Sequence, residues 1–466
     1  MNDERDERRA NTATNDTIVA AATGAGMGGI GIIRISGPDA ERILTAVFRP
    51  PEFDGRTPRS SGFESHRFYY GRMMDGEDQL DECMAVMMRS PRSYTREDVA
   101  EIHLHGGPYL IREGIRVCTD HGARLAEAGE FTRRAFLNGR IDLSRAEAVM
   151  SLIAAESRKE QQAAVKQLTG GSATFVRDIS EELIRLQSGI AACIDYPEEV
   201  SEEEGAGELR PGLEGLIRKL KDATDERSSR LIYGGLTVTL YGRPNVGKSS
   251  ILNALLGEEK AIVTDIPGTT RDIIQGEMML DGIKIRLTDT AGIRPTEDPV
   301  EKIGVERSRK AMREADMKLL VLDGSESLTE EDRALLESMG PDDAVMINKS
   351  DLRNIVTEKM IRSRYDVPVC LTVSAVERES LQALKELIRE KVQVSDGLAV
   401  TQPRHLNAIR RAVNHMEDAL ETMNAMTLDM VSVDLQAAQN ALCEITGEKA
   451  DEMLLDQVFS QFCVGK

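Results

Sequence analysis

The sequence predicts a chain of several domains, in which an α/β domain is inserted into a helical domain and an α+β domain precedes both. Three observations predict this class. The chain has 466 residues, enough for about three domains. Apolar residues follow helical spacing in two separate blocks, before residue 235 and after residue 395. Between these blocks, short apolar runs alternate with helical segments, which is typical of a mostly parallel sheet.

The α+β domain is expected over residues 1–137, with a disordered leader at 1–16. The leader is polar and charged and lacks the apolar core of a signal peptide. Residues 28–37 are expected to form a glycine turn followed by a short apolar strand. Further strands are expected at 83–88 and 99–104.

The helical domain is expected in two parts, over 138–234 and 396–466, with the α/β domain at 235–395 between them. Because both flanking parts are helical, one helical domain carrying an insertion is the economical arrangement. In the first part, the acidic stretch 197–204 is expected to be a solvated loop. More helix is expected to follow over 212–233.

The charge balance excludes a simple nucleic-acid coat protein. Lys and Arg number 59 against 79 Asp and Glu, so the net charge is −20. A uniformly acidic surface repels phosphate backbones, so any contact with RNA needs a local basic patch or a basic partner.

The six cysteines are spread over the whole chain and lack the spacing of a zinc site or a C-x-x-C motif. This pattern is typical of reduced thiols in a cytoplasmic protein. No apolar run approaches the length of a membrane span, so we expect no membrane association. Cys463 is either a reactive thiol near the end of the chain or an inert one.

Residues 242–249, GRPNVGKS, match the phosphate-loop pattern G-x-x-x-x-G-K-S. Its glycines let backbone N–H groups approach phosphates, Lys248 supplies a positive charge near the β- and γ-phosphates, and Ser249 can hold Mg²⁺. An apolar strand is expected before this loop, at 236–241, and a helix after it, at 250–256. This is the context that the motif requires, so a stray glycine loop is the weaker interpretation.

Three further motifs follow in order, each at the end of an expected strand. Asp289-Thr290-Ala291-Gly292 can reach the Mg²⁺ shell and sense a γ-phosphate. Asp351, in Asn348-Lys349-Ser350-Asp351, can accept the paired donors of guanine that adenine lacks. Ser374-Ala375 can contact the guanine oxygen. Together with the phosphate loop, these motifs predict a Ras-like P-loop GTPase. The residues expected to bind GTP are Asn245, Val246, Gly247, Lys248, Ser249, Ser250, Thr264, Asp265, Ile266, Pro267, Gly268, Thr269, Thr270, Asp289, Thr290, Ala291, Gly292, Asn348, Lys349, Asp351, Ser374, Ala375 and Val376.

The segment 264–272 is long and bears a glycine, so it is a candidate switch loop in which Thr270 is the second Mg²⁺ ligand beside Ser249. Ile293 stands just after the D-x-x-G motif, where many GTPases have a glutamine that orients water. Another group must then assist hydrolysis. The candidate carboxylates are Glu297, Asp298 and Glu301, and the candidate arginine fingers are Arg271 and Arg294.

Asn245 can contribute an amide oxygen to a monovalent cation beside the phosphates, together with backbone carbonyls of 264–269. A K⁺ ion there would place its charge where an arginine finger acts. The alternative is that Asn245 only braces the loop.

Outside the nucleotide motifs, residues 129–143 read GEFTRRAFLNGRIDL, a long and specific stretch. This stretch and several others resemble the TrmE/MnmE family of tRNA-modification GTPases. The resemblance covers residues 17–466. The other matching stretches are 17–20, 28–37, 93–101, 105–108, 445–448 and 462–466.

The resemblance implies an N-terminal domain that dimerises and binds a tetrahydrofolate derivative, the 5-formyl or 5,10-methylene form. Its expected contacts are Arg34, Glu101, Arg140 and Lys466. The family position of Arg140 can hold Lys, and GAGM at 24–27 stands where a basic side chain is common.

The resemblance also implies a partner and a reaction. With the FAD-dependent protein GidA/MnmG, in a heterotetramer, the family adds a carboxymethylaminomethyl or aminomethyl group at C5 of the wobble uridine of certain tRNAs. The tRNA is expected to contact mainly the partner. GTP hydrolysis is expected to be stimulated by K⁺, with Glu301 holding the attacking water. The expected K⁺ ligands are Asn245, Thr264, Ile266 and Thr269.

A rival interpretation is a regulatory or ribosome-assembly GTPase switch without modification chemistry. Such proteins usually carry an added RNA-binding domain, and the sequence has no basic motif of that kind. Two local alternatives also remain. Arg34 can extend to solvent from a sheet edge, and His103 and His105 alternate on a strand as metal ligands or, more simply, as ordinary histidines.

Overall fold

The computed structural model divides the chain into two compact units, each of which we describe by itself. Unit 1 holds residues 1–150, 167–188 and 432–466, and unit 2 holds 151–166 and 189–431. The structure describes residues 16–24, 26–50, 62–196, 202–258, 275–289, 311–395, 397, 399–425 and 428–466.

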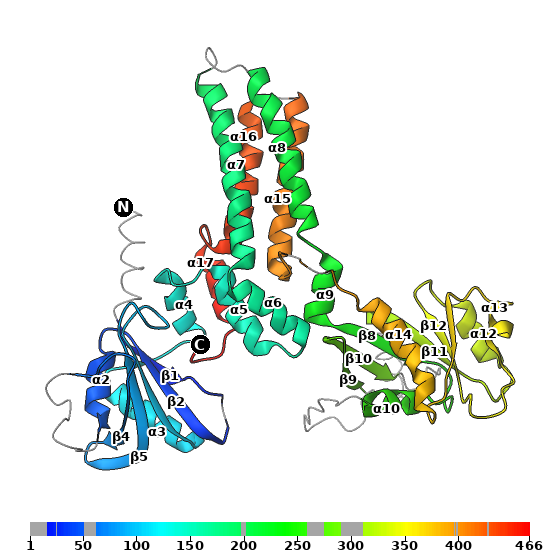
Figure 1. Cartoon of the computed structure of the whole chain (residues 1–466), viewed down its shortest axis with the longest axis horizontal. Helices are drawn as coiled ribbons and strands as arrows, with labels where there is room; N and C mark the ends of the chain where they lie inside the picture. Colours follow the sequence, from blue (N-terminus) through cyan, green and yellow to red (C-terminus); the bar gives the residue numbers. More distant parts are fainter. Residues whose placement is uncertain are drawn as a thin grey trace, which may run out of the picture. The chain divides into compact units, whose positions relative to one another are not determined.

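Unit 1 contains a seven-stranded sheet with the order β3-β4-β5-β6-β2-β1-β7 (Figure 1). The strands expected at 28–37, 83–88 and 99–104 are confirmed. Neighbouring strands of this sheet pair antiparallel, except β1 and β7, which pair parallel. The strands are β1 (Ile18–Ala21), β2 (Gly28–Ser36), β3 (Phe48–Arg49), β4 (Phe68–Asp75), β5 (Asp78–Met88), β6 (Val99–Gly106) and β7 (Arg124–Leu125).

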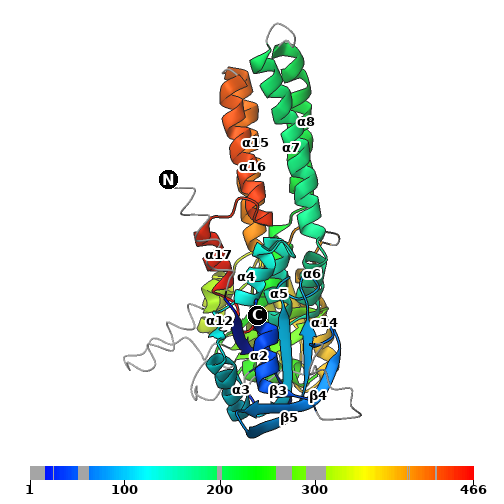
Figure 2. The same ribbon diagram turned by 90° about the vertical axis from the view of Figure 1, so that its left-hand side faces the viewer.

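Two helices, α2 (Ala40–Val47) and α3 (Pro108–Asp120), pack against each other and against strands of this sheet (Figure 2). Ile33, Ile35 and Ile102 are fully buried in the resulting core. Because successive residues of a strand point to opposite faces, their neighbours on β2 and β6 lie on the other face of the sheet. That face carries the polar side chains described below.

The remaining described helices of unit 1 include α4 (Glu130–Leu137) and α17 (Glu452–Phe459), which contact each other. Leu143, Phe459 and Phe462 form a small core beside them. The other helices are α5 (Leu143–Ala154), α7 (Gly171–Asp195) and α16 (Leu428–Thr446), parts of which belong to unit 2.

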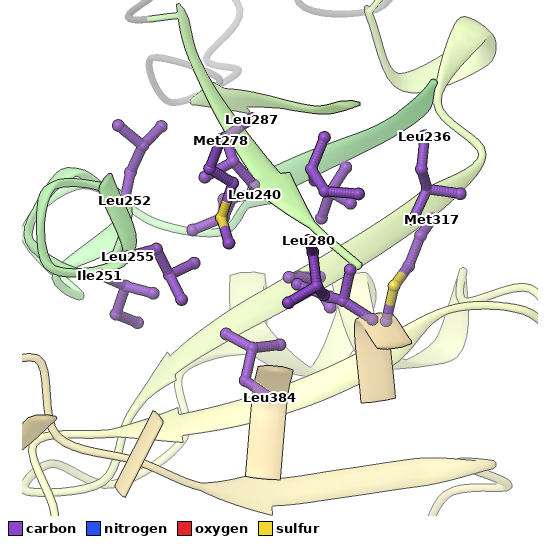
Figure 3. Close-up of a cluster of buried hydrophobic side chains, with 14 of the residues drawn as sticks. Leu236, Leu240, Ile251, Leu252, Leu255, Met278, Leu280, Leu287, Met317 and Leu384 are labelled. Atoms are coloured by element: carbon purple, nitrogen blue, oxygen red, sulfur yellow. The ribbon is translucent and has the colours of Figure 1, made fainter. Parts of the chain in front are cut away.

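Unit 2 contains a six-stranded sheet with the order β13-β12-β11-β8-β10-β9, parallel except for β9. A large apolar core lies beside it, formed by residues such as Leu240, Leu255 and Leu287 (Figure 3). The strands are β8 (Leu236–Tyr241), β9 (Gln275–Leu280), β10 (Ile283–Asp289), β11 (Met317–Asp323), β12 (Ala344–Asn348) and β13 (Val369–Thr372). The helices beside them are α10 (Lys248–Glu258), α12 (Glu330–Glu337), α13 (Glu358–Arg362), the 3₁₀ turn η1 (Arg378–Leu381) and α14 (Gln382–Lys391).

The long helices of unit 2 correct one expectation. Helix α8 runs from Glu202 to Asp222, so residues 202–204 of the acidic stretch are helical and do not belong to a solvated loop. Acidic side chains in a first turn are stabilised by the helix dipole, which explains how such a stretch can begin a helix. Helix α15 (Pro403–Ala425) packs against both α8 and α9 (Glu226–Gly234). Helix α6 (Arg158–Leu168) lies mostly in unit 2.

Within the part of the chain that the structure describes, no helix is both long and apolar enough to cross a membrane.

Candidate functional site

The phosphate loop joins β8 to α10 as the sequence predicts, and it needs its glycines. Gly242 has a φ of +140° and Gly247 a φ of +97°, values that favour glycine. Side chains at these positions would also overlap the carbonyl oxygen of Val321 and the amide of Asn348. Asn245 adopts a left-handed φ of 63°, which asparagine tolerates better than most residues.

Lys248, the first residue of α10, is held by the loop itself. Its Nζ donates hydrogen bonds to the carbonyl oxygens of Gly242 at 3.0 Å and Arg243 at 2.8 Å. Burial lowers the pKa of Lys248, and the nearby charges of Asp289 and Glu331 partly oppose this shift. The two hydrogen bonds place the Lys248 ammonium group within the loop that is expected to hold the phosphates.

A candidate Mg²⁺ position lies where α10 begins beside the end of β10. The Ser249 hydroxyl donates to Oδ2 of Asp289. The other carboxylate oxygen, Oδ1, is buried and has no hydrogen-bond partner within the described residues. A hydroxyl beside an unsatisfied buried carboxylate oxygen is a donor set that suits Mg²⁺.

The candidate base-binding residues are brought together after β12 and β13. Asn348 donates from Nδ2 to the Val246 carbonyl at 2.8 Å, which joins this site to the phosphate loop. The Ala375 N–H donates to Oδ1 of Asn348 at 3.3 Å. The Ser374 hydroxyl donates to Oδ1 of Asp351 at 2.6 Å and so orients that carboxylate. The carboxyl ends of parallel strands thus gather these side chains, as they do in other α/β nucleotide sites.

The flanking members of these motifs occupy the same edge. Lys349 has a left-handed φ of 66° and pairs with Asp323 at 2.5 Å. Ser250 is exposed on the first turn of α10, and Val376 is 80% exposed after β13.

The remaining predicted nucleotide-site residues lie outside the described residues. They include the expected catalytic Glu301, the second Mg²⁺ ligand Thr270 and the expected K⁺ ligands after Asn245. The full set is Thr264, Asp265, Ile266, Pro267, Gly268, Thr269, Thr270, Thr290, Ala291, Gly292 and Glu301, with the rival candidates Arg271, Arg294, Glu297 and Asp298.

A second cluster lies on the polar face of the sheet in unit 1. Arg34 on β2 pairs through Nε with Oε1 of Glu101 on β6 at 2.8 Å, and the two side chains are only 15% and 16% exposed. Since β2 lies between β1 and β6, Arg34 does not extend from a sheet edge, and that alternative is wrong.

Aromatic rings complete this cluster. The Arg34 guanidinium lies 5.2 Å from the ring centre of Tyr94 and 5.8 Å from that of Phe131. Arg140 also stacks on Tyr94, at 4.8 Å. Such cation–π contacts hold both guanidinium groups in place. Two of the predicted ligand-binding arginines therefore share one ring, and Thr132 fixes the ring's hydroxyl at 2.9 Å.

Glu101 is held as an anion by its neighbours. Burial raises its pKa, but hydrogen bonds and charges from His103 and Arg34 outweigh burial and hold the pKa below its ordinary value of 4.5. His103 Nε2 lies 3.3 Å from Oε2 of the same carboxylate. His105 instead contacts Asp81, and no group of three or more His, Cys, Asp or Glu side chains in the described residues could hold a metal ion.

The segment after α17 reaches this cluster. Val464 pairs with Ala128 through an isolated antiparallel bridge. Nη1 of Arg34 donates to the Gly465 carbonyl at 3.5 Å. Lys466, half-buried, follows directly, and its N–H donates to the Cys463 carbonyl at 3.3 Å. Cys463 itself is exposed. The structure thus gathers three predicted residues, Arg34, Glu101 and Arg140, and places the fourth, Lys466, beside them.

Sequence reasoning missed several residues at these two sites. Three of them lie within motifs or strands that the sequence already indicated: Tyr94, Phe131 and His103. Their aromatic or imidazole side chains, close in sequence to predicted ligand-binding residues, could have identified them. Asp332, which pairs with Arg243, has no local signal because it lies 89 residues away in the chain.

The fold and the two sites define a class: a P-loop GTP-binding protein that carries a separate N-terminal domain. The family description "GTP-binding protein TrmE N-terminus" matches residues 17–140, and "MnmE helical domain" matches residues 143–463. The chain belongs to the MnmE family of tRNA modification GTPases.

Individual relatives align over nearly the whole chain. The tRNA modification GTPase MnmE of Heliobacterium modesticaldum is 44% identical over 97% of this chain and 99% of its own. The protein of the same name from Bacillus subtilis is 42% identical over 97% of this chain and 100% of its own. The G domain of the T. maritima FeoB iron transporter is 30% identical over 34% of this chain and 99% of its own, at a TM-score of 0.28.

Proposed function

We propose that this chain binds and hydrolyses GTP and acts in tRNA modification, as the names of its relatives say of them. One observation supports the guanine specificity most directly: Ser374 and Ala375 meet Asp351 and Asn348 at the edge that also carries the phosphate loop. A carboxylate oriented in this position can accept both donors of the guanine edge, which adenine does not offer.

In the proposed mechanism, backbone N–H groups of the phosphate loop and Lys248 bind the β- and γ-phosphates and counter the charge that develops on the transferred group. Mg²⁺, held by Ser249 and Thr270 with Asp289 nearby, would supply further positive charge. Glu301 would orient the attacking water, since Ile293 cannot do so.

We further propose that K⁺ stimulates this hydrolysis. The expected ligand among the described residues is Asn245, which is exposed on the phosphate loop. Its partners would be Thr264, Ile266 and Thr269. Equal hydrolysis rates in KCl and NaCl would refute the proposal for K⁺.

The catalytic role of Glu301 has its own test. A Glu301→Ala variant that binds and hydrolyses GTP normally would refute that role.

The guanine proposal is tested by Asp351→Asn. An amide can donate to the 2-oxo group of xanthine, where a carboxylate would repel it, so we expect GTP affinity to fall at least about 100-fold and XTP affinity to rise. Competition titrations with labelled GDP, GTP, XTP and ATP measure the change. Lys359→Asn on α13 is a control that should leave all four affinities unchanged. Wild-type preference for ATP would contradict the proposal.

We propose that the cluster of Arg34, Glu101, Arg140 and Lys466 binds a tetrahydrofolate derivative, in the 5-formyl or 5,10-methylene form, as a one-carbon donor. Its chemistry suits this ligand class, because the cationic side chains can pair with the carboxylates of the ligand and the Glu101 carboxylate can accept from N–H groups of its heterocycle. The product would be a carboxymethylaminomethyl or aminomethyl group at C5 of a wobble uridine.

Isothermal titration with 5-formyl-tetrahydrofolate tests the proposal for folate binding. We expect Arg34→Ala to weaken binding about tenfold or more, since it removes a cation from the cluster and leaves Glu101 without its arginine partner. Arg67→Ala, in an exposed pair on the same domain, is the control and should bind like wild type. A wild-type chain that shows no binding would leave a GTPase switch without modification chemistry as the better reading.

The proposed partners come from membership of the MnmE family, and the charge of the chain bears only on which of them contacts the tRNA. With a net charge of −20, this protein would leave most contacts with tRNA to the FAD-dependent partner GidA/MnmG, in a cytoplasmic heterotetramer built on a homodimer of this chain. A tRNA-binding assay with each protein alone would contradict this view if this chain bound tRNA the more tightly.

A further inference from the structure

The beginning of the phosphate loop is held by a buried ion pair. Nε of Arg243, the loop's second residue, donates to Oδ1 of Asp332 at 2.8 Å. The Asp332 side chain is 2% exposed and the Arg243 side chain 18%. A charge this deeply buried is expensive to leave unpaired, so the pair fixes the position of both partners.

Asp332 is itself fixed by the helix that it begins. Its other oxygen, Oδ2, accepts from the Thr329 N–H at 3.0 Å and from the Thr329 hydroxyl at 2.8 Å. The two residues form a capping box at the start of α12. Leu336 anchors this helix in the apolar core. Arg243 is therefore tied to a rigid element of the domain, through a carboxylate that has no freedom to turn.

The position of Arg243 determines where the first half of the loop lies. Its carbonyl oxygen is one of the two that hold Lys248. At the other end of the loop, Asn348 holds the Val246 carbonyl. The loop is thus held near both ends. Asp332 on α12 pairs with Arg243, and Asn348 at the end of β12 binds the Val246 carbonyl.

We propose that Asp332 is a positioning residue for the nucleotide phosphates: by pairing with Arg243, it holds the first half of the phosphate loop in the shape that binds GDP and GTP. This inference rests on the proposed nucleotide site and adds to it a residue that does not touch the ligand.

Asp332→Ala in the full chain tests the inference, with the affinity for fluorescently labelled GDP as the first measurement and the melting temperature of the nucleotide-free protein as the second. We expect GDP affinity to fall about tenfold, because the loop loses one of the side chains that hold it in place. Asp332→Asn keeps the size of the side chain and an acceptor for Thr329, so it provides a variant that folds. It should weaken GDP binding at least about threefold.

Thr329→Ala is the matched control. It removes the hydroxyl of the same capping box and leaves the Arg243–Asp332 pair in place. It should lower the melting temperature, as Asp332→Ala does, while GDP affinity stays within about twofold of wild type. If Thr329→Ala weakens GDP binding as much as Asp332→Ala, the effect is only that of a destabilised helix and the inference is overturned.

A double-mutant cycle completes the test. Because Asp332 is proposed to act through Arg243, Arg243→Ala and Asp332→Ala together should bind GDP no more weakly than the weaker single variant. Additive losses, or an Asp332→Ala variant that binds GDP like wild type, would overturn the inference alone. A wild-type chain that binds no GDP would overturn the proposed function with it.

Discussion

Arg34 lies in a strand with a neighbour on each side, where a guanidinium group is stable only with a partner. The sequence identifies an arginine inside an apolar strand, but the partner Glu101 is 67 residues away. Which residues face each other across β2 and β6 depends on the register of the two strands, and no local pattern encodes it. The sequence therefore predicted that Arg34 needs a partner, but the strand spacing did not predict which residue that partner is.

Glu101 gives a prediction at this scale. Its folded-state pKa lies below 4.5, so its ionised form stabilises the fold above that pH, and the stabilisation is lost as the pH falls through the folded-state pKa. We expect Glu101→Gln to lower the free energy of unfolding by about 1–2 kcal/mol near neutral pH, because Arg34 loses a charged acceptor.

Urea unfolding of both proteins between neutral pH and about pH 3.5 measures this effect, and the difference between them should shrink below pH 4.5. Glu64→Gln, in an exposed pair with Arg67, should be indistinguishable from wild type throughout. A constant difference across the whole pH range would contradict the role of the Glu101 charge.

At the scale of elements, short patterns with strict context were the most reliable. The strand at 236–241 has the expected bounds, because an apolar β-branched run followed by a glycine loop has little choice of conformation. The start of α8 was predicted wrongly, since acidic residues suit both a loop and a helix N-terminus. The switch loop expected at 264–272 stays a prediction, because it lies outside the described residues.

The segment after α17 supplies the prediction at this scale. Gly465 has a φ of +97°, and a side chain there would overlap the carbonyl oxygen of Ala21. Gly465→Ala should therefore displace residues 463–466 from the sheet of unit 1 at a cost of about 1–2 kcal/mol. Carboxypeptidase digestion of the folded protein should become several times faster, since the released segment is open to the enzyme.

Gly24→Ala is the control for this substitution, because no atom of the described residues beyond its chain neighbours lies within 4 Å of the added carbon. It should be digested at the wild-type rate. If Gly465→Ala were digested equally slowly, the close approach of this segment to Ala21 would not hold the segment in place.

At the scale of the whole molecule, the sequence predicted an insertion because two helical blocks flank an α/β segment. The family description "MnmE helical domain" matches residues 143–463, a range that covers most of both helical blocks together with the α/β segment between them. The exact domain boundaries stay predictions, since the two compact units divide the long helices α7 and α16 within their length. Long-range contacts such as that of Arg34 with Gly465 could not be predicted from spacing.

The cysteines give a prediction for the whole molecule. Five of the six are buried and Cys463 is exposed. Burial raises the pKa of the Cys83 and Cys118 thiols to about 12 and that of Cys370 to about 11, so these thiols are also poor nucleophiles. A thiol reagent should label one cysteine per native chain at pH 8 and all six after denaturation.

Cys463→Ser should abolish the native labelling without changing the melting temperature, because the side chain is exposed. Rapid labelling of two or more cysteines in the native protein would contradict this description of the core.

The contact of Gly465 with Arg34 has a consequence for biosynthesis. During translation, the sheet of unit 1 leaves the ribosome early, whereas the segment that touches its polar face is made only after all of unit 2. The cluster around Arg34 is therefore completed late. A nascent or prematurely terminated polypeptide can form the nucleotide site while the cluster around Arg34 still lacks residues 463–466.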